Sequence, residues 1–129
     1  MTIERKLLST SPSGGATDVA EVFSTDLYRG TAGAHSINNG IDLAGEGGMV
    51  WIKARNQGAG HTIYDTERGA GEGIFPDKTN IEATASNFSS FNSNGWSFNA
   101  NGVGNYSNYE FVAWTFRKKE KFFDIVTVN

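Results

Sequence analysis

Residues 45–55 constrain the fold more than any other stretch of this 129-residue chain. The stretch begins with a glycine-rich turn and continues into Met-Val-Trp-Ile, four bulky apolar residues in a row. Because side chains alternate along a β-strand, Met49 and Trp51 are expected on one face and Val50 and Ile52 on the other. A strand that is apolar on both faces is typical of a position covered on both faces. We therefore predict that this chain folds into stacked β-sheets.

Similar strand-like segments recur along most of the chain, and residues 109–117 repeat the two-faced apolar pattern. No window of 11 or more residues keeps the apolar period of a helix. The predicted strands are residues 22–29, 34–37, 41–43, 49–55, 61–65, 87–91, 95–98, 109–117 and 121–128. The sequence Asn-Asn-Gly at 38–40 predicts a hairpin turn, whereas residues 69–80 and 99–108 are expected to form long polar loops. Short strands at this spacing predict an all-β, jelly-roll-like antiparallel β-sandwich.

The first residues differ from this pattern. Residues 9–17 are small, with Ser, Thr, Gly, Ala and one Pro, so they can bury little apolar surface. We therefore divide the chain into an extended N-terminal arm, residues 1–20, and a sandwich domain, residues 21–129. Ile3, Leu7 and Leu8 give the arm apolar side chains with which it could attach to a partner. The alternative is a frayed terminus.

Composition excludes several classes of protein. The formal net charge is -3 with only 11 Lys and Arg residues, so the chain lacks the basic footprint of a nucleic-acid-binding protein. No apolar run approaches the roughly 20 residues of a membrane-spanning helix. The absence of cysteine excludes disulfides and Cys-ligated metals. The first eight residues carry charges and no apolar run, so we expect no signal peptide and folding in a cytoplasm.

The strongest catalytic candidate is the pair Asp65 and Glu67. On one face of a strand, two such carboxylates could act as nucleophile and general acid in glycoside hydrolysis. Arg68 and Gly69 follow at once, however, which indicates that the chain is leaving the strand. We therefore expect a structural turn in which Arg68 neutralises Asp65, and we predict that the protein is not an enzyme.

Metal binding is the next possibility that the acidic residues raise. Asp77, Asn80 and Glu82, or Glu72 with Asp77, could offer oxygen ligands to Ca²⁺. The spacing lacks the regular acidic ladder of a calcium loop. We predict no metal or other cofactor, and keep Ca²⁺ as the alternative.

Residues 99–108 hold the candidate ligand-binding side chains. Asn amides can read sugar hydroxyls and a tyrosine ring can stack on a sugar face, so this loop predicts a glycan site. Its candidate residues are Asn99, Asn101, Asn105, Tyr106 and Asn108. In the alternative interpretation, the asparagines only form turns, because Asn tolerates the left-handed backbone conformation.

Several motifs occur in an order that resembles a known module. These are Val22-Phe-Ser-Thr25, Ile37-Asn-Asn-Gly-Ile-Asp-Leu43, Gly47-Gly-Met-Val-Trp-Ile-Lys53, His61-Thr-Ile-Tyr-Asp-Thr-Glu-Arg-Gly69, Ser90-Phe-Asn-Ser-Asn-Gly-Trp-Ser-Phe98 and Phe111-Val-Ala-Trp-Thr-Phe-Arg117. Together they resemble the concanavalin-like or laminin-G-like β-sandwich module in virion proteins of tailed bacteriophages. The resemblance covers about residues 22–128, and it implies a structural or adhesive role, often in trimers, with no agreed catalytic residue.

The expected function is therefore that of a structural virion protein, in a tail fibre or another host-adhesion appendage. Its expected partners are other virion proteins, further copies of itself (a trimer being one arrangement) and a host surface glycan. Its expected place is the virion, after assembly in the host cytoplasm. The alternatives are a capsid decoration protein, a lectin, and a glycan-degrading enzyme that uses Asp65 and Glu67.

Overall fold

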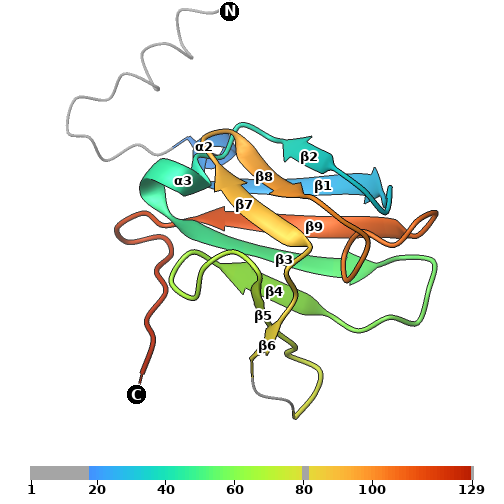
Figure 1. Ribbon diagram of the computed structural model, residues 1–129. Coiled ribbons are helices and arrows are strands. Elements are labelled where there is room, and N and C mark those ends of the chain that lie inside the picture. The colour runs from blue at the N-terminus through green and yellow to red at the C-terminus, as the bar shows by residue number, and fades with distance from the viewer. Residues whose placement is uncertain (1–17, 80–81, 129) are drawn as a thin grey trace, which may run out of the picture.

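The structure is a computed structural model, and it describes residues 18–79 and 82–128. This part of the chain forms two antiparallel β-sheets and two one-turn helices, α2 (Val19–Val22) and α3 (Leu43–Glu46) (Figure 1). The predicted all-β antiparallel sandwich is thereby confirmed. Neither helix is long or apolar enough to cross a membrane.

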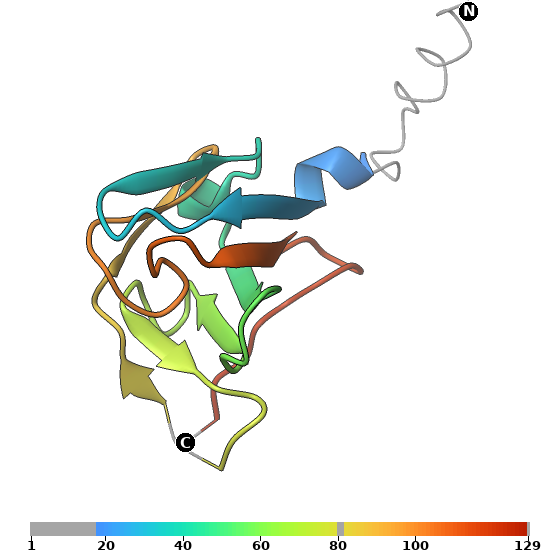
Figure 2. The same ribbon diagram turned by 90° about the vertical axis from the view of Figure 1, so that its right-hand side faces the viewer.

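The two sheets differ in size. In spatial order, the larger sheet contains β1 (Phe23–Arg29), β9 (Glu110–Arg117), β3 (Gly48–Ala54), β4 (Thr62–Asp65), β5 (Glu72–Ile74) and β6 (Ala83–Thr84). The smaller sheet contains β2 (His35–Asn38), β8 (Gly95–Phe98) and β7 (Phe88–Asn92). Figures 1 and 2 show the smaller sheet lying over the β1, β9 and β3 part of the larger one.

The core lies between the sheets and is rich in aromatic rings. Val50 and Ile52 of β3 are buried on the inner face, as their alternation with Met49 and Trp51 predicted. The smaller sheet contributes Trp96, which is fully buried. The rings of Tyr64 and Phe88 stack across the core with their centroids 4.2 Å apart. Strand alternation in the sequence therefore identified the inner face of β3 correctly.

The other face of the larger sheet is not covered as predicted. We call it the outer face; its apolar members on β1, β9 and β3 are Phe23, Leu27, Met49, Trp51, Val112, Trp114 and Phe116. Within the described residues, no second sheet packs on it, and the Leu27 side chain is 64% exposed. At one end, Phe123 stacks on Phe116 with the centroids 5.3 Å apart, where the C-terminal segment crosses this side (Figure 2). Apart from Leu27, the outer-face side chains named above are half-buried, so the predicted burial of both faces is only partly met here and is wrong for Leu27.

The predicted hairpin around Asn38-Asn-Gly40 is also wrong. β2 pairs with β8 in the described structure, and residues 41–43 form no strand. Instead, the Asp42 side chain caps α3, accepting a hydrogen bond from the Gly45 backbone N–H at 2.7 Å. A helix cap satisfies backbone donors locally, so the chain turns into a helix at the point where a returning strand was expected.

The predicted strand at residues 121–128 does not form. Lys119 and Phe123 make an isolated bridge, and no strand follows it as far as Val128. Both edges of β9 already pair, with β1 and with β3, so the preceding strand offers no free edge to a returning segment. The Lys121 φ of 67° turns the chain away as well.

Two other boundaries also change. The loop predicted at residues 69–80 contains β5, which pairs with β4 and β6. Val22, predicted as the first residue of the strand 22–29, belongs to α2 and is 1% exposed, and β1 begins at Phe23. The arm residues Ile3, Leu7 and Leu8 lie outside the described residues.

Candidate binding site beside loop 99–108

Buried polar groups anchor the loop 99–108 to the sandwich. Asn105 is 0% exposed, and its amide nitrogen donates to the backbone oxygens of Gly33 at 2.9 Å and Ala100 at 3.0 Å. Its side-chain oxygen accepts from the Thr31 backbone N–H at 3.0 Å. One buried amide thereby ties the loop both to itself and to the β1–β2 connection. If the loop moved away, these buried backbone groups would lose their hydrogen-bond partner at a cost in free energy. Asn105 therefore stabilises the observed conformation of the loop.

Two further side chains hold the same loop. The Tyr28 hydroxyl donates to the Gly104 oxygen at 2.8 Å, and the Asn87 amide donates to the Val103 oxygen at 2.9 Å. Burial, and secondarily the nearby Tyr64, raise the pKa of Tyr28 well above its usual value, so this hydroxyl keeps its proton and stays a donor. Gly102 has φ 153°, and a Cβ there would lie 2.7 Å from the Asn87 side chain. The loop therefore rests closely on the body of the domain.

An open hollow of about 590 Å³ lies beside this loop, and we call it the loop hollow. Its lining combines three separated parts of the chain. The lining residues are Phe75, Thr84, Ala85, Ser86, Asn87, Asn99, Ala100, Asn101, Gly102, Val103 and Tyr106. This lining holds two aromatic rings, several amides and hydroxyls, and no ionisable carboxylate, ammonium or guanidinium group.

The structure brings together three of the five predicted glycan-binding residues. Asn99, Asn101 and Tyr106 all line the loop hollow, and Tyr106 is 36% exposed. Asn105 must be removed from the candidate site, because it is fully buried and its amide is engaged with backbone groups. Asn108 does not line the hollow; its φ of 66° shows the turn-forming role of the alternative interpretation.

The opposite wall of the hollow was not predicted from the sequence. Phe75 and residues 84–87 line it, yet they precede Asn99 by many residues and share no motif with it. Sheet pairing brings them there, since β5 pairs with β6 and the Asn99 backbone N–H donates to the Asn87 oxygen at 2.9 Å. No local pattern in the sequence could have signalled this contact.

A smaller hollow of about 220 Å³ adjoins the first, sharing Phe75, Val103 and Tyr106 in its lining. Its other lining residues include Ile52, Phe111 and Lys78, so it is more apolar and carries one cation. Tyr106 therefore forms part of the wall between two neighbouring hollows. Its ring is supported by Tyr109, with the centroids 5.2 Å apart.

The carboxylates proposed for catalysis lie in a structural turn. Asp65 is 2% exposed, and its oxygens accept from the Arg68 backbone N–H at 2.8 Å and the Arg68 guanidinium at 2.5 Å. Glu67 follows the end of β4 and pairs with Lys118 at 3.3 Å. The turn locked by Arg68 is therefore confirmed, and the two carboxylates do not share a strand face. A buried, paired Asp65 is not placed to attack a sugar.

The residues considered for calcium have other roles. Asp77 accepts a hydrogen bond from the His61 backbone N–H at 3.3 Å, whereas Glu72 accepts one from the Thr84 hydroxyl at 3.3 Å. Glu82 pairs with Arg68 at 3.5 Å, and Asn80 lies outside the described residues. Among residues 18–79 and 82–128, no three His, Cys, Asp or Glu side chains gather as metal ligands.

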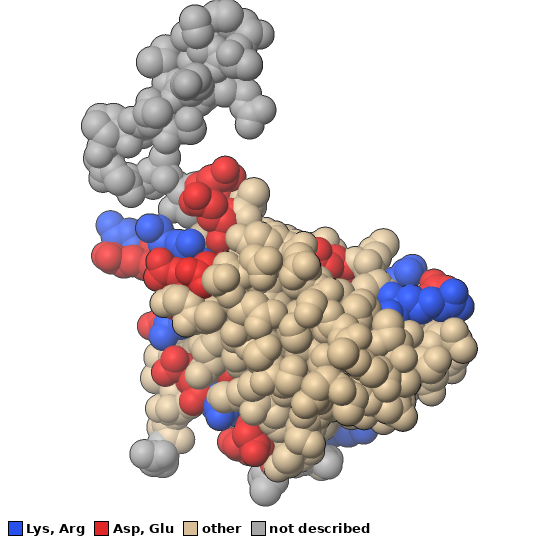
Figure 3. Space-filling view, turned by 45° about the horizontal axis from the view of Figure 1, so that its top comes forward, with Lys and Arg blue, Asp and Glu red and all other residues tan. Residues whose placement is uncertain are grey.

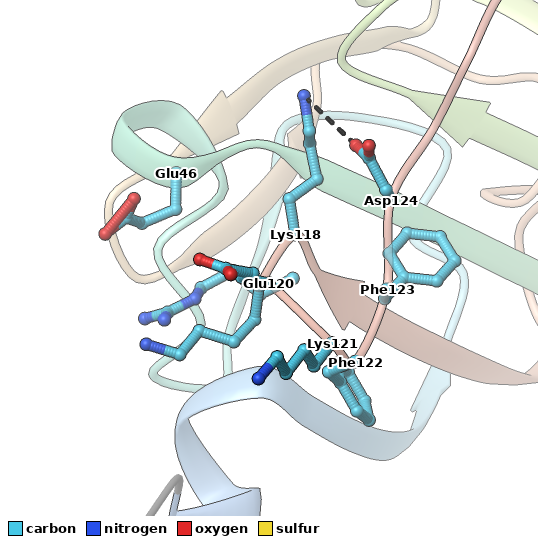
Figure 4. Close-up of a pocket in the computed structure, with 9 residues that line it drawn as sticks. Glu46, Lys118, Glu120, Lys121, Phe122, Phe123 and Asp124 are labelled. Atoms are coloured by element: carbon cyan, nitrogen blue, oxygen red, sulfur yellow. Dashed lines mark ion pairs between the residues drawn. The ribbon is translucent and has the colours of Figure 1, made fainter. Parts of the chain in front are cut away.

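A third hollow, of about 690 Å³, lies at the turn after β9 (Figure 4). It contains both signs of charge, with Arg117 and three lysines near Glu46, Glu120 and Asp124. Lys118 lies 3.7 Å from Asp124, the ion pair drawn in Figure 4. The hydrogen bond that the Lys118 ammonium donates to Glu67 is the main cause of the raised pKa of Lys118. Exposed pairs of this kind contribute little stability, so we regard this region as a solvated turn.

Comparison with known proteins identifies the family of the chain. Residues 18–122 match the model of a family described as a domain of unknown function, DUF7483. The chain belongs to the DUF7483 family. No curated protein and no solved structure matches it. The DUF7483 match contains the loop hollow and the outer face, whereas the predicted attachment residues Ile3, Leu7 and Leu8 precede it.

Proposed function

We propose that this DUF7483 chain is a structural virion protein of a tailed bacteriophage, in a tail fibre or another host-contact appendage. The ordered motifs that resemble phage β-sandwich modules support the proposal, and the antiparallel sandwich is the fold that this resemblance implies. The protein would be assembled in the host cytoplasm and end in the virion. Its partners would be other virion proteins and further copies of itself.

The outer face is the observation that carries a role in assembly. Its seven apolar side chains lie side by side on β1, β9 and β3, with Trp51 and Trp114 directly paired across neighbouring strands. Their ring centroids are 5.9 Å apart, edge to face. Soluble monomers rarely leave a large contiguous apolar patch facing water. A second copy of this chain is the covering partner that the expected homo-oligomer would supply.

A non-catalytic role fits the polar groups of the domain. Asp65 is neutralised by Arg68, while the His61 side chain accepts the Trp51 indole N–H at 3.0 Å. His35 contacts the buried Asn105 amide at 3.4 Å. These side chains make contacts that hold strands and loops together, as expected in a structural protein.

Light scattering on the purified protein tests the assembly role. Leu27→Glu places a charge on the outer face at a side chain that is 64% exposed, so the fold should survive and association should weaken. Val19→Glu is the matched control, because Val19 is 66% exposed but lies on α2. We expect an oligomer for the wild type and the control, and a shift toward monomer for Leu27→Glu. A wild-type monomer at every concentration would contradict the proposal.

Electron microscopy of gold-labelled particles tests the location. We expect label on the tail or its fibres, since the proposed role is contact with the host. Label on the capsomers would instead favour the alternative, a capsid decoration protein, and would overturn the tail assignment.

A further inference from the structure

We propose that the loop hollow binds an uncharged oligosaccharide, with Tyr106 as the stacking residue and Asn99, Asn101 and Ser86 as the groups that read hydroxyls. This inference rests on the proposed host-contact role and names a ligand class for it. Asn105 and Asn108, which the sequence predicted as ligand-binding residues, are not part of this site. Phe75 and residues 84–87 form its second wall.

The lining has two chemical features that sugar binding uses, aromatic rings and hydrogen-bonding side chains. A sugar ring presents a C–H face that packs on an aromatic ring, and Tyr106 and Phe75 supply such rings. It also presents hydroxyls that both donate and accept hydrogen bonds, which amide and hydroxyl side chains can match. Within the described residues, the side chains of Asn99, Asn101 and Ser86 make no hydrogen bond to protein, so they can bond a ligand.

The loop beside the hollow is also preorganised in the absence of a ligand. The anchors Asn105, Tyr28 and Asn87 each hold backbone groups of the loop, and each is bonded to residues between Ala100 and Gly104. A loop that is already ordered loses little conformational entropy on binding. The volume of about 590 Å³ lies within the range of roughly 300–1,000 Å³ that small-ligand sites occupy. An ordered, open hollow of this size can accommodate a short oligosaccharide.

Charge decides between neutral and acidic saccharides. The lining contains no charged group, and the nearby Glu72, which bonds Thr84, is negative. Lys78 lies over the Phe75 ring at 5.8 Å, where the aromatic face engages it. On the face seen in Figure 3, Lys, Arg, Asp and Glu gather mainly at the margins of the molecule. The lining of the loop hollow therefore offers no cation to a carboxylate or sulfate on the sugar, and Lys78 lines only the adjoining smaller hollow.

The test is saturation-transfer NMR and calorimetry on the full chain. The probes are a panel of neutral oligosaccharides of glucose, galactose, mannose and N-acetylglucosamine, with sialylated and sulfated oligosaccharides alongside. We expect binding of at least one neutral probe and stronger binding than its acidic counterpart. Tyr106→Ala should lower the affinity by about tenfold and Asn101→Ala by about fivefold, as expected for a lost stacking face and a lost hydrogen bond.

Control variants distinguish binding at the loop hollow from binding elsewhere on the surface. Ser107→Ala changes an exposed residue of the same loop outside the lining, and Phe122→Ala removes an aromatic ring that is 48% exposed elsewhere. Both should bind like the wild type. Tyr106→Phe keeps the ring and should retain most of the affinity, which guards against a loss caused by misfolding. When the wild-type protein is titrated with the bound oligosaccharide, the changes in backbone amide chemical shift should be largest in residues 84–87 and 99–106.

Each outcome bears on this inference separately from the proposed function. Absence of binding to every neutral probe, preference for the acidic ones, or shifts that map elsewhere would overturn the saccharide site. None of these results alters the light-scattering result or the particle label, which test assembly and location. Conversely, a monomer that still binds a neutral sugar through Tyr106 would preserve this site and remove the assembly role.

Discussion

Two tyrosines on the inner face of the larger sheet, the half-buried Tyr28 and the fully buried Tyr64, differ in their hydrogen bonding. The Tyr28 hydroxyl donates to the Gly104 oxygen, whereas the Tyr64 hydroxyl has no hydrogen-bond partner among the described residues. Tyr64 is 0% exposed, so its hydroxyl has also lost contact with water. A buried, unsatisfied hydroxyl costs free energy, while a satisfied one contributes a little stability. The two positions therefore predict opposite effects for the same change.

Tyr64→Phe should raise the free energy of unfolding by about 1 kcal/mol, because it removes an unpaired polar group and keeps the ring that stacks on Phe88. Tyr28→Phe should lower it by about 1 to 2 kcal/mol, since the Gly104 carbonyl loses its donor. Urea denaturation at neutral pH measures both. Equal effects at the two positions would show that Tyr64 has a partner after all.

The same tyrosines predict the response to alkaline pH. Burial is the main cause that raises the pKa of both above the ordinary value of 10.0, with smaller effects of Tyr64 on Tyr28 and of Tyr106 on Tyr64. A raised folded-state pKa means that the neutral phenol is favoured by folding. This stability is fully present below pH 10 and is lost as the pH rises through the folded-state values. The urea midpoint should therefore fall above about pH 10, and fall less steeply in Tyr64→Phe.

At the scale of elements, the contact between Gly30 and the loop 99–108 is the tightest constraint on the loop hollow. A Cβ on Gly30 would lie 2.0 Å from the Tyr106 backbone oxygen, and backbone cannot move aside as a flexible side chain can. Gly30 also bonds this region from its own backbone, donating to the Tyr109 oxygen at 2.9 Å. The end of β1 and the loop therefore fit together only without a side chain at this position.

Gly30→Ala should lower the free energy of unfolding by about 2 kcal/mol through overpacking, and it should displace the Tyr106 end of the loop hollow. Gly58→Ala is the control, since a Cβ there has nothing within 4 Å. Its effect should stay within about 0.5 kcal/mol. Thermal denaturation of both variants measures the difference, and a Gly30→Ala protein as stable as the control would contradict the tight contact.

Element predictions succeeded where neighbouring residues determined the outcome. The strands predicted at residues 87–91 and 95–98 form β7 and β8, which pair across a tight turn that needs only local sequence. The strand expected at residues 121–128 depended instead on a free edge of β9, and β1 and β3 occupy both. Strand-forming residues without an available partner remain unpaired.

At the scale of the whole molecule, the family match begins at residue 18, and the described structure begins there too. The core uses residues from Val22 onward. We expect a chain that lacks residues 1–17 to unfold within about 0.5 kcal/mol of the intact protein, because it keeps every core residue of the described structure. If the arm with Ile3, Leu7 and Leu8 attaches to partners, the same deletion should reduce association in light scattering. A large loss of stability would instead assign the arm to the core.

The alternation of residues 49–55 was enough to predict strands, their two faces and a sandwich, because the period of a strand is a property of neighbouring residues. The pattern could not show which of those faces another layer would cover. That depends on which strands pair, and the pairing left Val50 inside and Leu27 facing water. The loop hollow likewise needed sheet pairing to bring Phe75 and residues 84–87 beside Asn101 and Tyr106. Contacts between distant segments depend on three-dimensional packing, which a local period does not encode.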